Sequence, residues 1–335
     1  MKKILNKPEA FVQEMMEGIV AAYGDKVTTL NGDYRVLVKN TSTKKGKVGI
    51  VTAGGSGHLP VFLGYVGDGL LDGCAVGNVF ASPSAQKMAD MIKACDNGSG
   101  VLCLYGNYGG DKLNFDMACE MVEMDDIETR TVLVSDDVAS SPQAIKEKRR
   151  GVAGMVYAFK IAGAAAESGL SLEEVTRVAK KALETTRTMG VALSPCIVPE
   201  VGKPTFTINE NEIEIGMGIH GEPGIEVRPM MSADEIASLV LEKILEDAPL
   251  SSGDEVSVMV NGLGATPLEE LLIVYRKLHQ ILSSIGVRIF MPHIGEFATS
   301  MEMAGLSVTV IKLDEELRNY LRFPGQSPFY TNANK

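Results

Sequence analysis

The sequence predicts an α/β protein made of two domains, each with a mostly parallel or mixed sheet flanked by helices. The chain has 335 residues, enough for about two domains of roughly 150 residues each. Short apolar segments alternate with amphipathic ones along most of it, which is the pattern of strands and helices in turn. The 35 Gly and 14 Pro show no Gly-X-Y period, which excludes collagen-like and low-complexity chains.

The first half of the chain predicts a sheet with helices on its faces. Residues 8–23 carry Phe11, Met15, Ile19 and Val20 at helical spacing, and the apolar segment from Lys47 to Thr52 is typical of a buried strand. Further strands are expected near 73–79, 100–105 and 130–134, and helices at 84–95 and 112–124. This alternation favours a mostly parallel sheet.

A helical stretch separates the two halves. An Ala-rich segment runs from 151 to Glu167, and Ser171 to Glu174 form a predicted capping box that opens a helix ending near Thr188. We therefore place the domain boundary after this helix, with domains at 1–190 and 191–335.

The second half begins irregularly and then alternates again. Three prolines, Pro195, Pro199 and Pro204, mark connections between short strands, one of which is Glu212 to Ile215. The later expected elements are a helix at 232–246 capped by Ser232, a strand at 255–260, a helix at 267–283, a strand at 287–291, a helix at 296–303, a strand at 306–312 and a helix from Asp314. In the 267–283 helix, a stripe of apolar residues is expected to pack in the core: Leu268, Leu271, Leu272, Tyr275, Leu278 and Leu282.

Charge and cysteine content narrow the class of protein. The net charge of −11 disfavours nucleic acid and anionic membrane surfaces as partners. The five cysteines have no C-x-x-C spacing, so neither a disulfide framework nor a structural zinc site is indicated. The sequence has no apolar segment of 18 residues and no signal-like start. These features predict a cytoplasmic protein that does not bind membranes.

The first candidate site follows the strand that ends at Thr52. It reads Ala53-Gly54-Gly55-Ser56-Gly57-His58, at the carboxyl end of a strand, where open α/β sheets bind ligands. Glycines there let the backbone approach a ligand closely, although many such turns use Gly only for its conformation. His58 makes the site more specific.

The second candidate site is Asp111, after the strand at 100–105. The segment Gly106-Asn107-Tyr108-Gly109-Gly110-Asp111 leads into the next helix. Asp is common at a helix N-cap, and that is the commoner role. A carboxylate at the mouth of a sheet can also act as a general base, and the two roles are compatible.

The third candidate site is His220, within Gly216-Met217-Gly218-Ile219-His220-Gly221-Glu222-Pro223-Gly224. A histidine among flexible glycines is either an exposed turn residue or a functional group. His279 and His293 are expected to be structural. His58, Asp111 and His220 could together bind a metal ion, but nothing in their spacing requires one, and no metal is predicted.

At these sites the sequence resembles the substrate-binding K subunits of dihydroxyacetone kinases. The resemblance runs over essentially the whole chain. Beyond the three sites, it rests on Arg149-Arg150-Gly151-Val152-Ala153-Gly154, Val198-Pro199-Glu200-Val201-Gly202-Lys203-Pro204 and Val260-Asn261-Gly262-Leu263-Gly264-Ala265-Thr266-Pro267.

The resemblance implies a covalent mechanism. The residue at His220 would attack the ketone carbon of the substrate and hold it as a hemiaminal. His58 and Asp111 would bind and deprotonate the hydroxyl that is phosphorylated, and Gly54, Gly55, Ser56 and Gly57 would line the pocket. A neutral imidazole adds to a carbonyl and not to a polyol, so glycerol would be rejected.

The phosphate donor is expected on another subunit. The sequence has no G-x-x-x-x-G-K-[ST] loop, and no cofactor is expected in this chain. The resemblance implies a separate nucleotide-binding L subunit that carries Mg and an adenine nucleotide and is itself phosphorylated by a phosphotransferase-system protein. Because the sequence ends at Lys335, the separate-subunit form is expected rather than a fused ATP-binding domain. A homodimer is implied as well.

Two departures and one rival interpretation accompany the resemblance. Leu59 replaces a Glu and Gly106 replaces a Lys that are common in the family, so the substrate could be dihydroxyacetone or a four-carbon ketose. Some relatives bind the ketose but act as coactivators of a transcription factor. Because a sensor needs only the carbonyl trap, Asp111 as a base favours the enzyme. A nucleotide-binding oxidoreductase would need a G-x-G-x-x-G turn, which is absent.

Overall fold

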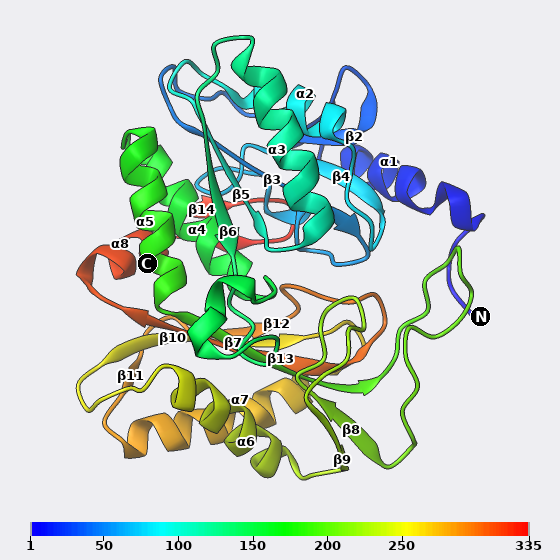
Figure 1. Cartoon of the computed structure of the whole chain (residues 1–335), viewed down its shortest axis with the longest axis vertical. Coiled ribbons are helices and arrows are strands. Elements are labelled where there is room, and N and C mark those ends of the chain that lie inside the picture. Colours follow the sequence, from blue (N-terminus) through cyan, green and yellow to red (C-terminus); the bar gives the residue numbers. More distant parts are fainter. Residues whose placement is uncertain (1, 334–335) are drawn as a thin grey trace.

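The computed structural model describes residues 2–333, which form alternating layers of helix and sheet (Figure 1). From top to bottom the layers are α2 and α3, a first sheet, a central helical layer with α4 and α5, a second sheet, and α6 and α7. The main hydrophobic core lies in the central layer, where α4 residues such as Phe159 pack between Leu102 of the first sheet and Ile311 of the second. Two further cores lie on the outer faces of the two sheets.

The first sheet has the strand order β1-β2-β4-β3-β5-β6. Its strands are β1 (Val27–Leu30), β2 (Asp33–Lys39), β3 (Gly49–Ser56), β4 (Gly73–Val79), β5 (Val101–Gly106) and β6 (Thr129–Val134). The pairs β3–β4, β3–β5 and β5–β6 are parallel, as the alternation predicts. The hairpin β1–β2 and the pair β2–β4 are antiparallel, so the sheet is mixed.

The second sheet is mostly antiparallel. Its order is β11-β10-β13-β7-β8-β9, with β12 also paired to β10. Its strands are β7 (Thr186–Ser194), β8 (Glu212–Ile215), β9 (Glu226–Pro229), β10 (Glu255–Gly262), β11 (Arg288–Ile289), β12 (His293–Gly295) and β13 (Ala304–Leu313). Among the strand pairs of this sheet in the described residues, only β10–β11 and β10–β12 are parallel. The prediction of two mostly parallel or mixed sheets flanked by helices is confirmed.

The helices that form agree with predicted ones apart from their ends. They are α1 (Phe11–Tyr23), α2 (Ala85–Cys95), α3 (Gly109–Glu123), α4 (Gly154–Glu167), α5 (Leu172–Glu184), α6 (Ala233–Asp247), α7 (Leu268–Ser284) and α8 (Glu315–Arg322). The side chain of Ser171 caps α5, and Ser232 forms a complete capping box with Glu235 at the start of α6. Short 3₁₀ segments lie at Pro8–Ala10, Leu63–Tyr65 and Gln143–Lys148, and β14 (Gly325–Gln326) pairs with β15 (Thr331–Asn332) near the end of the chain.

Four expectations about these elements are wrong. The helix expected to reach Thr188 ends at Glu184, because Thr186 to Thr188 already pair with β13. No helix forms at 296–303, where the backbone is held by contacts described below. The first glycine-rich segment lies partly inside β3 rather than after it, since that strand continues to Ser56. Leu268 and Leu272 of α7 are exposed, and Val274 packs in the core instead.

The chain crosses between the two sheets more than once. β7 spans residues 186–194 and so contains the predicted domain boundary at 190/191. After β13 the chain returns to the central layer, where Leu317 and Leu321 of α8 join the main core. The division into 1–190 and 191–335 stays a prediction. No helix in residues 2–333 is both long enough and apolar enough to cross a lipid bilayer.

Candidate functional site

The three predicted segments meet at one place. His58 follows β3, Asp111 lies in the first turn of α3 after β5, and His220 lies in the loop after β8. The imidazole centroids of His58 and His220 are 4.8 Å apart, and the charge of His220 acts on the Asp111 carboxyl. Since β3 and β5 are parallel neighbours, their carboxyl ends bring His58 and Asp111 to the same edge of the sheet.

His58 is completely buried, and one of its ring nitrogens has no partner. Its Nδ1 lies 2.8 Å from the carbonyl oxygen of Thr299, while its Nε2 makes no hydrogen bond. A carbonyl oxygen only accepts, so Nδ1 carries the hydrogen and Nε2 presents a lone pair. Burial lowers the pKa of His58 to about 3, which keeps the ring neutral. The ring stacks on Phe80 at 4.7 Å.

The segment 296–303 positions His58 and is itself held by Asn261. The Asn261 Oδ1 accepts hydrogen bonds from the backbone N–H groups of Phe297 and Ala298, at 2.8 and 2.9 Å. The backbone N–H groups of Thr299 and Met301 then donate to the carbonyls of His58 and Gly57. These partners replace the i to i−4 bonds of a helix, which explains why the helix expected here does not form.

The four residues before His58 are constrained by their own surroundings. A Cβ on Gly55 would lie 2.6 Å from the backbone nitrogen of Ala81, and one on Gly54 would collide with the Phe62 ring. The buried Ser56 hydroxyl donates to the carbonyl of Gly77 at 2.8 Å. Gly57 has φ +98°, a conformation that favours glycine. These residues shape the backbone next to His58, and their contact with a substrate stays a prediction.

Asp111 is a buried carboxyl with one oxygen unpaired. It is the third residue of α3 and Tyr108 occupies the N-cap, so the N-cap interpretation is wrong. Its Oδ1 has no hydrogen-bond partner. Burial raises its pKa to about 6, although a hydrogen bond with Ser82 and the charge of His220 act in the opposite direction. A carboxylate of this kind is more basic than an ordinary aspartate and still ionised at pH 7.

His220 is more exposed and has an acidic partner that sequence reasoning did not assign. Its Nδ1 lies 2.9 Å from Glu222 Oε1, and its backbone N–H donates to Glu222 Oε2 at 2.9 Å. Burial disfavours the charged carboxylate, but the hydrogen bond from His220 and its charge lower the pKa of Glu222 to about 2. An ionised carboxylate only accepts, so Nδ1 carries a hydrogen, and in the neutral form of the ring Nε2 has the lone pair. Glu222 lies two residues after His220, and this short spacing could have indicated the pairing.

Two aromatic rings complete the site. Tyr108 meets the His220 ring edge to face at 4.8 Å, and its hydroxyl donates to the carbonyl of Gly151. Phe80 lies against both histidines and has a positive φ of 57°. Neither was predicted, because their side chains reach the site only through the tertiary fold.

The other two histidines lie elsewhere. His279 is exposed on α7, and His293 packs among Tyr157, Phe297 and Tyr330. Within residues 2–333, the His, Cys, Asp and Glu side chains form no group of three or more arranged for a metal ion.

Fold and site together define an α/β protein in which two histidines and a buried, basic aspartate meet where two sheets join. The comparison with protein families agrees with this class. The Dak1 domain model matches residues 17–329, and the chain belongs to this family.

Two curated relatives and one solved structure illustrate the family. The dihydroxyacetone-binding subunit DhaK of PTS-dependent dihydroxyacetone kinase 1 from Listeria innocua is 45% identical over 94% of this chain and 95% of that protein. The L-erythrulose kinase of Pectobacterium atrosepticum is 44% identical over 98% of this chain but only 56% of its own length. The structure of the dihydroxyacetone kinase operon co-activator Dha-DhaQ has a TM-score of 0.90 at 30% identity, covering 96% of this chain and 98% of that one.

Proposed function

We propose that this chain is the substrate-binding subunit of a short-chain ketose kinase and that His220 captures the ketose covalently. The observation that carries the proposal is the pairing of His220 Nδ1 with Glu222. That pairing leaves Nε2 as a free nucleophile, and the unpaired Nε2 of His58 and Oδ1 of Asp111 are available beside it. Such a set suits a molecule that has both a carbonyl and a hydroxyl group.

The capture step is a simple addition. The Nε2 lone pair of His220 forms a bond to the ketone carbon, and the π pair of the C=O bond moves to oxygen, which takes up a proton. The Nδ1 proton passes to Glu222 or to solvent, so the product is a neutral hemiaminal with the full mass of the ketose. Glu222 stabilises the imidazolium character that develops during the attack. Glycerol has no carbonyl and cannot react.

The transfer step needs a base and a donor. Asp111 accepts the proton of the substrate hydroxyl as the hydroxyl oxygen attacks the terminal phosphorus of the donor, and the bond from that phosphorus to the departing nucleoside diphosphate breaks. His58 accepts a hydrogen bond from the substrate. The donor is an adenine nucleotide with Mg on a separate L subunit. A phosphotransferase-system protein phosphorylates that L subunit in turn. The absence of a phosphate-binding loop supports a donor site outside these 335 residues. We place the working form in the cytoplasm as a homodimer.

The substrate is either dihydroxyacetone or a four-carbon ketose such as erythrulose. The two relatives named for these substrates are 45% and 44% identical to the chain and so do not separate them. A Cβ on the buried Gly106 would lie 3.0 Å from the Tyr108 ring, so a lysine there would require Tyr108 to move. Gly106 and Leu59, in place of a lysine and a glutamate that are common in the family, favour a site that differs from the common dihydroxyacetone site.

The test is phosphoryl transfer to a panel of ketoses with the L subunit present. Product from a three- or four-carbon ketose, lost in Asp111→Asn, supports the kinase. The alternative is a ketose-binding coactivator, which the likeness to the Dha-DhaQ structure favours. Capture of the ketose without turnover of any panel member would establish that alternative.

A further inference from the structure

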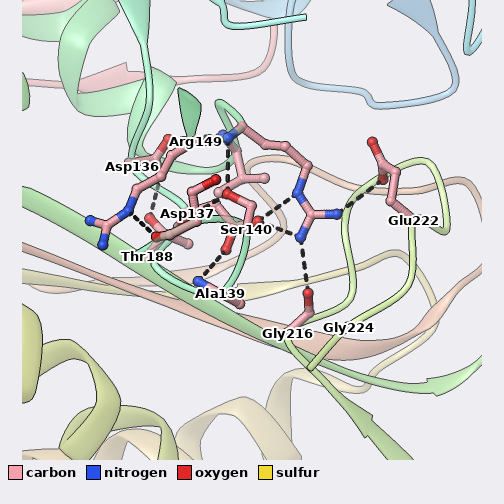
Figure 2. Close-up of polar contacts among 12 residues, drawn as sticks. Asp136, Asp137, Ala139, Ser140, Arg149, Thr188, Gly216, Glu222 and Gly224 are labelled. Carbon is pink, nitrogen blue, oxygen red and sulfur yellow. Dashed lines mark hydrogen bonds and ion pairs between the residues drawn. The ribbon is translucent and has the colours of Figure 1, made fainter. Parts of the chain in front are cut away.

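Arg150 connects the His220 loop to the rest of the protein, and Figure 2 labels its partners Asp137, Gly216 and Glu222. Its Nε donates to Asp137 Oδ2 at 2.9 Å, and its Nη2 donates to the carbonyl oxygen of Gly216 at 3.0 Å. Its Nη1 lies 3.9 Å from Glu222 Oε2. One guanidinium therefore joins the segment before α4 to both ends of the loop that carries His220.

We propose that Arg150 is a positioning residue for the nucleophile, acting through Glu222 on the orientation and tautomer of His220. The proposal rests on the proposed function of His220. Arg150 itself makes no contact with the ring; it fixes the carboxylate that does.

The acceptor atoms of Glu222 show how this works. Its Oε1 faces the His220 ring, while its Oε2 faces the His220 backbone N–H and the Arg150 guanidinium. The cation on Oε2 favours the ionised carboxylate, which can only accept a hydrogen bond. In the neutral form of His220, Nδ1 is then the protonated nitrogen, and Nε2 has the lone pair that attacks the ketone.

Gly218 provides a second, independent observation. A Cβ at this position would lie 2.1 Å from Glu222 Oε2 and 2.5 Å from Arg150 Nη1. The backbone of the loop therefore lies directly against the contact between Glu222 and Arg150, and a larger residue would displace one of these two side chains. The glycine and the ion pair are two parts of one arrangement.

Arg150 is itself firmly held. Asp137 is buried and also accepts from the backbone N–H of Ala139 at 3.1 Å. The backbone N–H of Arg150 donates to the Ser140 hydroxyl at 3.0 Å. A planar guanidinium with its donors in fixed directions suits this three-way contact, and a lysine ammonium does not reproduce it.

The neighbouring Arg149 is the matched control. It is also buried and pairs with a carboxylate, but its partner is Asp247 on α6, and it makes no contact with Glu222. Loss of Arg149 removes a buried ion pair of the same chemical type without touching the His220 loop. A general loss of stability would therefore affect both variants, whereas a change at His220 would affect only one.

The test combines NMR of the histidine tautomers with the rate of ketose adduct formation. The chain has only four histidines, so ¹⁵N-histidine labelling gives few signals, and His220→Asn assigns one of them. In the wild type we expect His220 to be protonated at Nδ1. In Arg150→Gln we expect a mixture of tautomers and adduct formation with dihydroxyacetone that is about tenfold to hundredfold slower, the size of effect found when partners of metal-ligating histidines are removed. Arg150→Lys should recover only part of the rate.

A double variant keeps the test informative if single variants are destabilised. In a Glu222→Gln background, Arg150→Gln should have no further effect on the adduct rate, because the two residues act as one unit. Equal effects of Arg149→Gln and Arg150→Gln on the tautomer, or additive effects of Arg150→Gln and Glu222→Gln, would overturn the proposal. If the wild type forms no adduct, the proposed function fails, while the tautomer spectra still decide the role of Arg150.

Discussion

The imidazole rings of His58 and His220 meet edge to face with their centroids 4.8 Å apart, although they come from loops of two different sheets. Each ring has its Nδ1 committed, one to a backbone carbonyl and the other to a carboxylate. Both Nε2 atoms are thereby available for chemistry. The junction of the two sheets is what creates the site, because neither sheet supplies both rings.

Replacing Asp111 with asparagine should stabilise the protein and abolish phosphoryl transfer. Burial raises the pKa of Asp111 from 3.8 to about 6, so the folded state is penalised for ionising this group. The penalty is absent below pH 4, grows between pH 4 and 6 and is complete above pH 6, where its removal should add about 1–3 kcal/mol. Urea unfolding of the wild type and of Asp111→Asn at pH 4 and pH 8 measures this difference in the free energy of unfolding. Equal stability of the two proteins at pH 8 would contradict the account.

The pH profile of phosphoryl transfer should fall on the acid side near pH 6. Asp111 must be ionised to accept the hydroxyl proton, and its pKa is raised to about 6. His58 adds no step near pH 6.5, because burial lowers its pKa to about 3. The dependence of kcat/KM on pH, measured with the L subunit present, tests this. A limb near pH 4 instead would show that Asp111 is an ordinary carboxylate or is not the base.

Alanine at Gly55 should damage the site more than alanine at a glycine with free space. The new Cβ would lie 2.6 Å from the Ala81 nitrogen and 2.9 Å from the Phe80 Cα. Both are backbone atoms, so the segment carrying Phe80 must shift away from Gly55, which changes the packing of Phe80 on His58. We expect the free energy of unfolding to fall by about 1–3 kcal/mol and ketose capture to weaken. Thermal unfolding measures the first effect, and the amount of adduct seen by mass spectrometry measures the second.

Gly18→Ala is the control for that substitution. Gly18 lies inside α1, and nothing lies within 4 Å of the position that a Cβ would occupy there. Alanine at this position should stabilise the helix by about 0.5–1 kcal/mol. If Gly55→Ala behaves like Gly18→Ala, the close approach of β3 to the Phe80 backbone is not important for the site.

Removing the Asn261 amide should loosen the segment that holds His58. Asn261 is fully buried and bonds to Phe297, Ala298 and Ser307. Asn261→Ala leaves the half-buried N–H group of Phe297 and the buried N–H and C=O groups of Ala298 without these partners, which should cost about 2–4 kcal/mol. Ketose capture should weaken as well, because Thr299 orients His58. The exposed Asn209→Ala serves as control in denaturant unfolding, and equal effects of the two changes would rule out this role.

The alternating strands and helices could be predicted from the sequence. The hairpin β1–β2 was not predicted, although the sequence contains a signal for it. Buried parallel strands such as β5 are continuous apolar segments, which makes them easy to recognise. The hairpin has a weaker pattern, but its turn residues Asn31 and Gly32 both have positive φ, and Asn-Gly is a strong hairpin signal. The segment 296–303 could not be predicted correctly, since its conformation depends on Asn261 and His58, which are distant in the sequence.

The titratable residues of the candidate site could be predicted from the sequence, but the residues that support them could not. His58, Asp111 and His220 stand next to glycines after strands, a pattern that is local. Thr299, Phe80 and Arg150 act from other segments, and their roles depend on contacts that form only in the folded chain. Glu222 lies between these cases, because it is two residues from His220 and its pairing is local.

The most direct test of the central claim is intact-protein mass spectrometry after incubation with dihydroxyacetone and erythrulose. The account predicts a mass increase equal to one whole ketose without loss of water, absent with glycerol and absent in His220→Ala. His279→Ala, which changes an exposed histidine far from the site, should react like the wild type. An adduct that persists in His220→Ala, or one that has lost water as a lysine imine would, would contradict it.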